Sequence, residues 1–227
     1  MFPSKLKNRT TWIFDLDNTL YSSSTGIFNQ IDLKMKEFIS MKLKISGDDS
    51  FKLQKKYYKK YGTTLYGLMR NYNIDPDEFC NYVHNVDFNL LSKSKMLKDR
   101  LQSLPGEKII YTNANYTYAE KVLNKLGIKE VFLDIFDIKK TDYIPKPMKR
   151  SLNQLIKKYK LNPWKTVYFE DLKKNLKYSS SIGFTTVHIS NESTNELDSY
   201  IDFRFKTIIN ALDMIIKVLN IEEKNEH

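Results

Sequence analysis

Two carboxylates stand one residue apart in the stretch WIFDLDNTLY, where Asp15 and Asp17 follow the apolar residues 12–14. The apolar run predicts a short buried strand, and acids gathered at its end would raise each other's pKa without a countercharge. A hard divalent cation supplies that charge, and oxygen ligands without a cluster of His or Cys favour Mg²⁺ over zinc. The pair therefore predicts a magnesium site, with coordination positions left for water and a substrate phosphate.

Polar residues also follow two later predicted strands. The stretch IIYTNA contains Thr112 and Asn113 at its end, and VYFED ends with Glu170 and Asp171. Strands that alternate with helices predict a parallel sheet covered by helices on both faces. Because ligands bind at the carboxyl ends of the strands in such sheets, we expect the three polar clusters to converge on one pocket.

The elements that must position these residues fall into two groups. Residues 24 to about 90 show helical spacing without a strand signal, and they include a helix start at Asp75 and Pro76. After them, strands and helices alternate. We therefore predict an α/β fold with a Rossmann-like parallel sheet and a helical cap inserted after the first strand. The predicted domains are a core of residues 1–22 and 92–227 and a cap of residues 23–91.

Length and composition limit the class of protein. With 227 residues, of which 41% are hydrophobic, the chain suits one core domain with an insertion. Cys80 is the only cysteine, which excludes an intrachain disulfide and favours a reducing compartment. The sequence has neither a signal-peptide pattern nor the roughly 20 apolar residues of a membrane-spanning helix. We expect a soluble, cytoplasmic protein without membrane association.

The net charge of +10 comes mostly from lysines that are scattered along the whole chain. A strongly basic protein can bind nucleic acid, but scattered lysines favour a compositional origin, and a positive field would also attract a phosphorylated substrate. The alternative from a different class is a basic protein that has the same α/β fold, binds nucleic acid and has no enzymatic activity. We disfavour it because Asp15 and Asp17 are both present.

Four motifs of this chain resemble, in order, those of the haloacid dehalogenase-like hydrolase superfamily. The first is Asp-x-Asp-x-Thr at residues 15–19, and the second is the strand that ends near Thr112. The third is Lys146 in IPKPMK, and the fourth is the acidic pair of VYFEDLKKN. Longer stretches, including YYKKYGTTLYGL and VHNVDF of the predicted cap, are similar to the pyrimidine 5′-nucleotidase-like branch. In one departure, Leu172 stands where that branch usually has Ser beside the metal ligands.

The resemblance implies a role for each motif residue. Asp15 would be the nucleophile that forms an aspartyl-phosphate, and Asp17 would protonate the leaving group and then activate water. Thr112, the backbone amide of Asn113 and Lys146 would bind the transferring phosphoryl group. Asn175, one helical turn after the acidic pair, could orient the metal ligands. The implied Mg²⁺ ligands are Asp15, Asp17 through its carbonyl, Asp171 and, through water, Glu170.

We therefore predict a Mg²⁺-dependent phosphomonoester hydrolase that uses a phosphoaspartate intermediate. The partner is a small phosphorylated metabolite, with a pyrimidine nucleoside 5′-monophosphate as the first candidate. The alternative is a phosphatase or phosphomutase for another small phosphate, such as a sugar phosphate or phosphoglycolate. Asp17 favours phosphate chemistry, since the dehalogenase members lack an acid there. In the predicted cap, His84 and Tyr61 are the candidates for substrate contact, with helix packing as the competing interpretation. The oligomeric state is left open.

Overall fold

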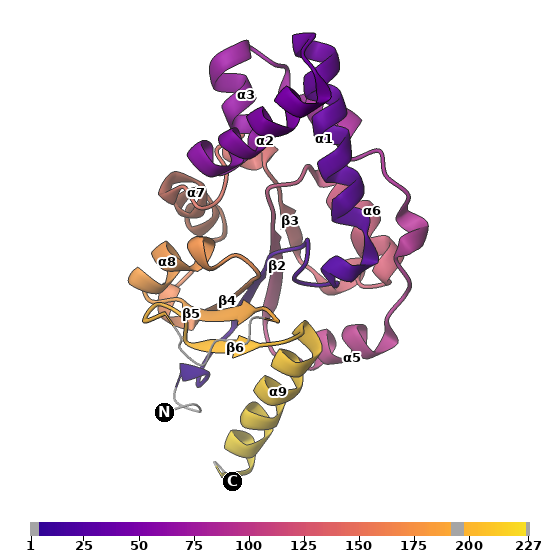
Figure 1. The fold of residues 1–227 in the computed structure, drawn as a ribbon. Coiled ribbons are helices and arrows are strands. Elements are labelled where there is room, and N and C mark those ends of the chain that lie inside the picture. Colours follow the sequence, from indigo (N-terminus) through magenta and orange to yellow (C-terminus); the bar gives the residue numbers. More distant parts are fainter. Residues whose placement is uncertain (1–4, 192–197, 226–227) are drawn as a thin grey trace.

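A six-stranded parallel sheet forms the centre of the protein (Figure 1). The computed structural model describes residues 5–191 and 198–225, so the parts of the predicted core that fall on 1–4, 192–197 and 226–227 lie outside the described residues. The strand order β3-β2-β1-β4-β5-β6 and the parallel pairing confirm the predicted α/β fold. The strands are β1 (Thr11–Phe14), β2 (Glu107–Tyr111), β3 (Asp134–Phe136), β4 (Thr166–Glu170), β5 (Thr185–Ile189) and β6 (Phe203–Phe205).

Helices cover both faces of this sheet. Because side chains alternate along a strand, Ile13 of β1 packs in one buried cluster and Phe14 packs in the other. The cluster of Phe14 is covered by α5 (Lys95–Ser103), α6 (Tyr116–Leu126) and α9 (Ile208–Asn225). The cluster of Ile13 is covered by α7 (Lys149–Tyr159) and α8 (Lys173–Ser181). Over the described ranges, no helix combines the length and apolar composition that crossing a membrane requires.

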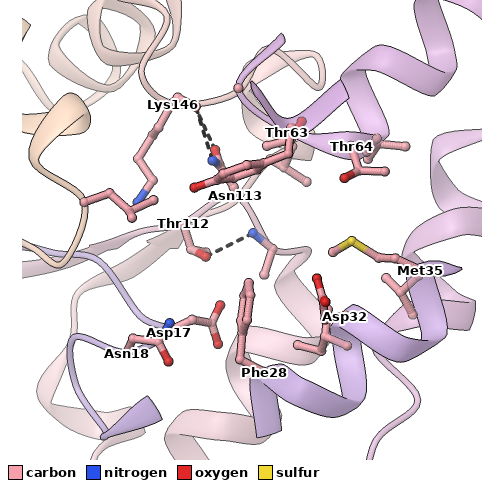
Figure 2. A pocket seen from close by; sticks show the side chains of 18 of the residues that line it. Asp17, Asn18, Phe28, Asp32, Met35, Thr63, Thr64, Thr112, Asn113 and Lys146 are labelled. Carbon is pink, nitrogen blue, oxygen red and sulfur yellow. Dashed lines mark hydrogen bonds between the residues drawn. The ribbon is translucent and has the colours of Figure 1, made fainter. Parts of the chain in front are cut away.

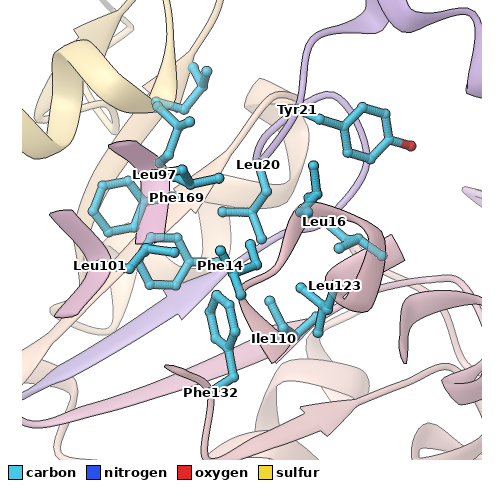
Figure 3. Close-up of a cluster of buried hydrophobic side chains, with 14 of the residues drawn as sticks. Phe14, Leu16, Leu20, Tyr21, Leu97, Leu101, Ile110, Leu123, Phe132 and Phe169 are labelled. Carbon is cyan, nitrogen blue, oxygen red and sulfur yellow. The ribbon is translucent and has the colours of Figure 1, made fainter. Parts of the chain in front are cut away.

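Aromatic packing stabilises the alignment of the two central strands, β1 and β4, along their length. The rings of Phe14 and Phe169 stack with centroids 4.5 Å apart and planes at 5°, and the ring of Phe132 meets Phe14 edge-on at 5.7 Å (Figure 3). Phe14 of β1 pairs in register with Phe169 of β4 and with Ile110 of β2. The residue after each of these strands therefore emerges at the same edge of the sheet.

Helices α1 to α4 follow β1, as the sequence pattern predicts, and they contain their own buried cluster. They sit above the carboxyl ends of the strands in Figure 1, and we call them the helical insertion (residues 27–83). The second helix begins at Gly47, where the side chain of Ser46 caps it by accepting from the N–H of Asp49. The four helices are α1 (Ile27–Leu43), α2 (Gly47–Tyr61), α3 (Thr64–Tyr72) and α4 (Pro76–Val83).

Candidate active site

The carboxyl ends of β1 and β4 bring three carboxylates together. Oxygen atoms of Asp15, Glu170 and Asp171 lie within 4.8 Å of one another. Asp15 and Glu170 are buried, with 6% and 1% of their surface exposed. The backbone N–H of Asp15 donates to the carbonyl of Phe169 at 2.9 Å, which extends the pairing of β1 and β4 to the first acid. The pairing register is thus what places the acids side by side.

Lys146 enters this cluster from the segment that precedes α7. Its Nζ donates to Asp15 Oδ1 at 2.5 Å, to Glu170 Oε2 at 2.9 Å and to the carbonyl of Tyr111 at 3.0 Å. Only 3% of its side chain is exposed. Asn113 holds the segment in place, because its Oδ1 accepts a hydrogen bond from the backbone N–H of Lys146 at 2.8 Å. Lys146 therefore pairs with two of the three clustered carboxylates.

Burial and the neighbouring charges together shift the pKa values of the three acids in different directions. Burial, and then the charge of Glu170, raises the pKa of Asp15 to about 7. Burial, and then the charges of Asp15 and Glu170, raises the pKa of Asp171 to about 9. The pKa of Glu170 is lowered instead, since the attraction of Lys146 and its hydrogen bonds outweigh the effect of burial. The cluster therefore holds more negative charge than Lys146 compensates.

The side chains present fit a hard divalent cation. The three carboxylates offer oxygen donors without a nearby Cys or His ligand among the described residues, and hard cations such as Mg²⁺ prefer oxygen. Asn175 of α8 lines the same cavity, and its buried Oδ1 has no hydrogen-bond partner in the described part of the chain. The Leu172 departure leaves α8 without a side-chain cap, but the backbone N–H of Leu172 still donates to Glu170 Oε1 at 3.3 Å.

Asp17 lies apart from the three clustered acids and is held by two phenols. The hydroxyl of Tyr118 donates to Asp17 Oδ1 at 2.7 Å, and the hydroxyl of Tyr21 donates to the same oxygen. Burial raises the pKa of Asp17, while the two phenolic hydrogen bonds oppose that effect. Sequence reasoning missed both tyrosines. Tyr21 stands within the DLDNTLY stretch, whereas Tyr118 is 101 residues from Asp17 and no pattern marks it.

The other motif residues lie at the same edge of the sheet, where Thr112, Asn113 and Lys146 line a cavity. Thr19 Oγ1 donates to Asp15 Oδ2 at 2.9 Å, so the threonine of the first motif orients the first aspartate. Thr112 Oγ1 accepts from the N–H of Ala114 at 3.0 Å. Figure 2 shows Asp17, Thr112, Asn113 and Lys146 around one space. The structure thus brings together the polar ends of β1, β2 and β4.

A cavity of about 330 Å³ extends from these strand ends into the helical insertion. Figure 2 shows Phe28 of α1 between Asp17 and Asp32 in this space. Its size falls at the small end of the range typical of small-molecule sites. The apolar part of its wall includes Phe28, Ile31, Met35, Leu65, Phe79, Val83 and Ile138.

The two residues predicted for substrate contact in the insertion have different positions. His84 lines the cavity, and its ring stacks on Tyr118 with centroids 4.5 Å apart. Burial lowers the pKa of His84 to about 4, so the imidazole is neutral at pH 7. Tyr61 is not among the lining residues, and its ring packs against Tyr57 with centroids 5.5 Å apart. Tyr58 lines the cavity instead, with Lys174 Nζ 4.0 Å from its ring centroid.

The sequence model of the haloacid dehalogenase-like hydrolase family matches residues 10–176. This chain therefore belongs to the haloacid dehalogenase-like hydrolases. Phosphate metabolism protein 8 of Saccharomyces cerevisiae is 28% identical to it over 136 residues. That match spans 55% of this chain and 42% of the length of the yeast protein.

Several solved structures share the fold. A HAD phosphatase from Thermococcus onnurineus has a TM-score of 0.62 and 16% identity, covering 91% of this chain and 97% of its own. The HAD-hydrolase YfnB from Bacillus subtilis, bound to magnesium, has a TM-score of 0.62 and 15% identity, with coverages of 92% and 99%. L-2-haloacid dehalogenase from Xanthobacter autotrophicus has a TM-score of 0.60 and 11% identity, with coverages of 91% and 98%. At these identities the likeness shows a common architecture.

Proposed function

We propose that this hydrolase is a Mg²⁺-dependent phosphomonoesterase whose substrate is a nucleoside 5′-monophosphate, with pyrimidine nucleotides as the first candidates. One observation carries the proposal: the buried Asp15 lines a cavity, pairs with Lys146 and belongs to a cluster of three acids whose charge Lys146 only partly compensates. A second acid, Asp17, borders the same cavity. In this proposal residues 23–91 form a cap domain over a core of residues 1–22 and 92–227. The single cysteine, Cys80, is buried and free, which supports a reducing, cytoplasmic location.

The proposed reaction has two steps. A carboxylate oxygen of Asp15 attacks phosphorus while Asp17 gives a proton to the departing alkoxide, which yields the alcohol and an aspartyl-phosphate. Asp17, now ionised, then takes a proton from water as that water attacks the same phosphorus. The second step releases phosphate and restores both carboxyl groups. Both steps need Asp17 to keep its position, and hydrogen bonds from Tyr21 and Tyr118 to Oδ1 leave Oδ2 for the proton transfer.

The remaining groups stabilise charge during these steps. Lys146 uses its three N–H donors on Asp15, Glu170 and the carbonyl of Tyr111, so it would bind a phosphoryl oxygen by giving up its bond to Asp15 while it stays paired with Glu170. Thr112 and the backbone amide of Asn113 supply further donors to the same group. Asp15, Glu170 and Asp171 would hold Mg²⁺, and the bound cation would neutralise their excess negative charge and that of the incoming phosphate.

Phosphate release from a panel of phosphomonoesters, with and without Mg²⁺, tests this proposal. The panel comprises CMP, UMP, AMP, ribose 5-phosphate, phosphoglycolate and p-nitrophenyl phosphate. We expect Mg²⁺-dependent release, with the highest kcat/KM for a nucleotide because the apolar wall of the cavity favours a flat ring. A higher kcat/KM for phosphoglycolate or ribose 5-phosphate would favour the other small phosphates. No release from any member would contradict phosphomonoesterase activity.

Replacing Tyr118 by Phe should lower kcat by about 10-fold with little change in KM, because one of the two hydrogen bonds that hold Asp17 is lost. The pKa of Asp17 should rise further, since the lost bond favours its ionised form. The limb of the pH–rate profile that belongs to Asp17 should therefore move to higher pH. Tyr159→Phe is the control, since it removes a phenol that donates to Asp134 at 2.6 Å outside the cavity. An unchanged pH profile in Tyr118→Phe would contradict this role.

The stability of the metal-free protein should fall as the pH rises. The pKa values of Asp15 and Asp171 are raised by folding to about 7 and about 9, so protons that the unfolded chain loses near pH 4 stay bound to the folded protein. This contribution is complete below about pH 4 and disappears as the pH passes these folded values. Mg²⁺ replaces the protons, so its stabilising effect should grow from pH 6 to pH 9.

Thermal unfolding with EDTA or with Mg²⁺ across this pH range measures the effect. Asp171→Asn removes one of the two titrating acids and should reduce the pH dependence of the metal-free protein. A shift in Tm on adding Mg²⁺ that is equal at every pH would show that the cation does not replace protons at this cluster.

A further inference from the structure

Three polar residues from two helices of the insertion line the cavity, and two of them donate hydrogen bonds to the third, Asp32. Gln54 Nε2 of α2 donates to Asp32 Oδ1 of α1 at 2.7 Å and to the Asp32 backbone carbonyl at 3.1 Å. Lys55 Nζ donates to Asp32 Oδ1 at 2.8 Å and to Oδ2 at 2.9 Å. We call these residues the Asp32 cluster (Asp32, Gln54 and Lys55). Figure 2 shows Asp32 on the opposite side of Phe28 from Asp17, so the cluster lies away from the strand ends.

Gln54 has an unused hydrogen-bond acceptor. Its amide orientation is defined, because turning it over would place an oxygen against two acceptors of Asp32. The residue is 1% exposed, and its Oε1 has no hydrogen-bond partner among the described residues. A buried acceptor without a donor costs free energy, and native structures seldom leave one unpaired. Gln54 lines the cavity, so a ligand bound there would lie beside this residue.

Asp32 also has acceptor capacity to spare. A carboxylate has about four lone-pair positions, and here Oδ1 accepts two hydrogen bonds while Oδ2 accepts one from Lys55. Lys55 neutralises the charge, so the carboxylate presents an acceptor without repelling a phosphorylated molecule. The side chain is one-third exposed, at 33%, and it borders the apolar wall formed by Phe28 and Met35. This end of the cavity therefore combines two free acceptors with apolar surfaces that suit a flat ring.

We propose that the Asp32 cluster selects nucleoside 5′-monophosphates whose base carries an exocyclic amino group. The inference rests on the proposed nucleotidase function. An amino group has two N–H donors for Gln54 Oε1 and Asp32 Oδ2, which places cytosine or adenine at this end of the cavity. In uracil or hypoxanthine a carbonyl oxygen takes the place of the amino group and would face these acceptors. A site built to bind a donor discriminates strongly against an analogue that lacks it, because its own polar groups are then left unpaired.

Two substrate pairs that differ at this one group test the inference: CMP against UMP, and AMP against IMP. We expect the wild-type protein to prefer the amino member of at least one pair by about 10-fold or more in kcat/KM. Asp32→Asn exchanges an acceptor for a donor and should bring that ratio close to one or reverse it. Gln54→Met removes the acceptor at similar volume and should reduce the ratio. A ratio within one protein preparation does not depend on the fraction of folded molecules.

A similar pair of residues outside the cavity provides the control. Gln154 Nε2 donates to Asp142 Oδ2 at 3.1 Å, and neither residue lines the cavity. Gln154→Met and Asp142→Asn should leave the substrate ratios unchanged. Competitive inhibition by cytidine and by uridine gives a second measurement that involves binding alone, and the ratio of inhibition constants should follow the same order.

The outcomes separate this inference from the proposed function. If all four nucleotides are hydrolysed with ratios within about twofold, in the wild type and in Asp32→Asn, the selection is wrong and the nucleotidase proposal stands. A preference for UMP and IMP would also overturn the selection. If p-nitrophenyl phosphate is hydrolysed but no nucleotide is, the proposed nucleotide substrate is wrong and the inference fails with it.

Discussion

Asp15→Asn should lower kcat/KM for phosphate release by about 1,000-fold or more, because a neutral amide is too weak a nucleophile to attack phosphorus. The substitution keeps the shape of the side chain, and its oxygen can still accept the hydrogen bond from Thr19. It also removes one of three clustered acids whose charge Lys146 alone does not compensate, so we expect the variant to fold. Steady-state release at saturating Mg²⁺, with a rapid quench and mass measurement of the enzyme, would follow both turnover and the aspartyl-phosphate.

Asp137→Asn is the matched control. Asp137 is also a buried acid, 3% exposed, directly after a strand of the sheet. It accepts a hydrogen bond from the backbone N–H of Tyr116 at 2.9 Å and does not line the cavity. We expect this variant to keep wild-type turnover and to form the phosphoenzyme. If Asp15→Asn retains full turnover, or if its enzyme still gains a phosphoryl group, another residue is the nucleophile.

Lys146→Met should destabilise the metal-free protein by about 3–5 kcal/mol at neutral pH, because removing one member of a buried ion pair leaves its partners uncompensated. Lys146 is paired with both Asp15 and Glu170, and all three side chains are at least nine-tenths buried. Mg²⁺ should restore part of the lost stability, since it offers the same acids another countercharge. Turnover should still fall by about 100-fold at saturating Mg²⁺, through loss of a donor to the phosphoryl group.

Lys108→Met distinguishes this effect from the removal of any buried lysine. Lys108 is 7% exposed, but its Nζ donates to the backbone carbonyls of Leu104 and Gly106, at 2.7 and 3.0 Å. We expect a smaller loss of stability, no rescue by Mg²⁺ and unchanged turnover. Chemical unfolding with EDTA or with Mg²⁺ compares the two variants. Equal losses in both, with the same response to Mg²⁺, would mean that the ion pairs of Lys146 do not compensate the acid cluster.

The local pattern of residues was sufficient to predict the architecture and the edge of the sheet where the polar residues gather. Apolar runs that end in acids, and helices that begin with caps such as Asp75 before Pro76, depend on interactions within a few residues. The parallel sheet follows from the alternation of strands and helices, and in a parallel sheet every carboxyl end lies at the same edge. The gathering of Asp15 and Glu170 at one edge was therefore predictable, whereas their direct contact depends on β1 and β4 being neighbours in the strand order.

Tertiary structure decided which side chains bind one another across that edge and within the insertion. The hydrogen bond from Tyr118 to Asp17 spans 101 residues, and the contact of Gln54 with Asp32 joins two helices. The choice of Tyr58 rather than Tyr61 as a lining residue depends on how α2 is rotated against its neighbours. Helical periodicity defines which face of a helix is buried, but contacts at its margins depend on the docking of helices, which is set by packing over the whole molecule.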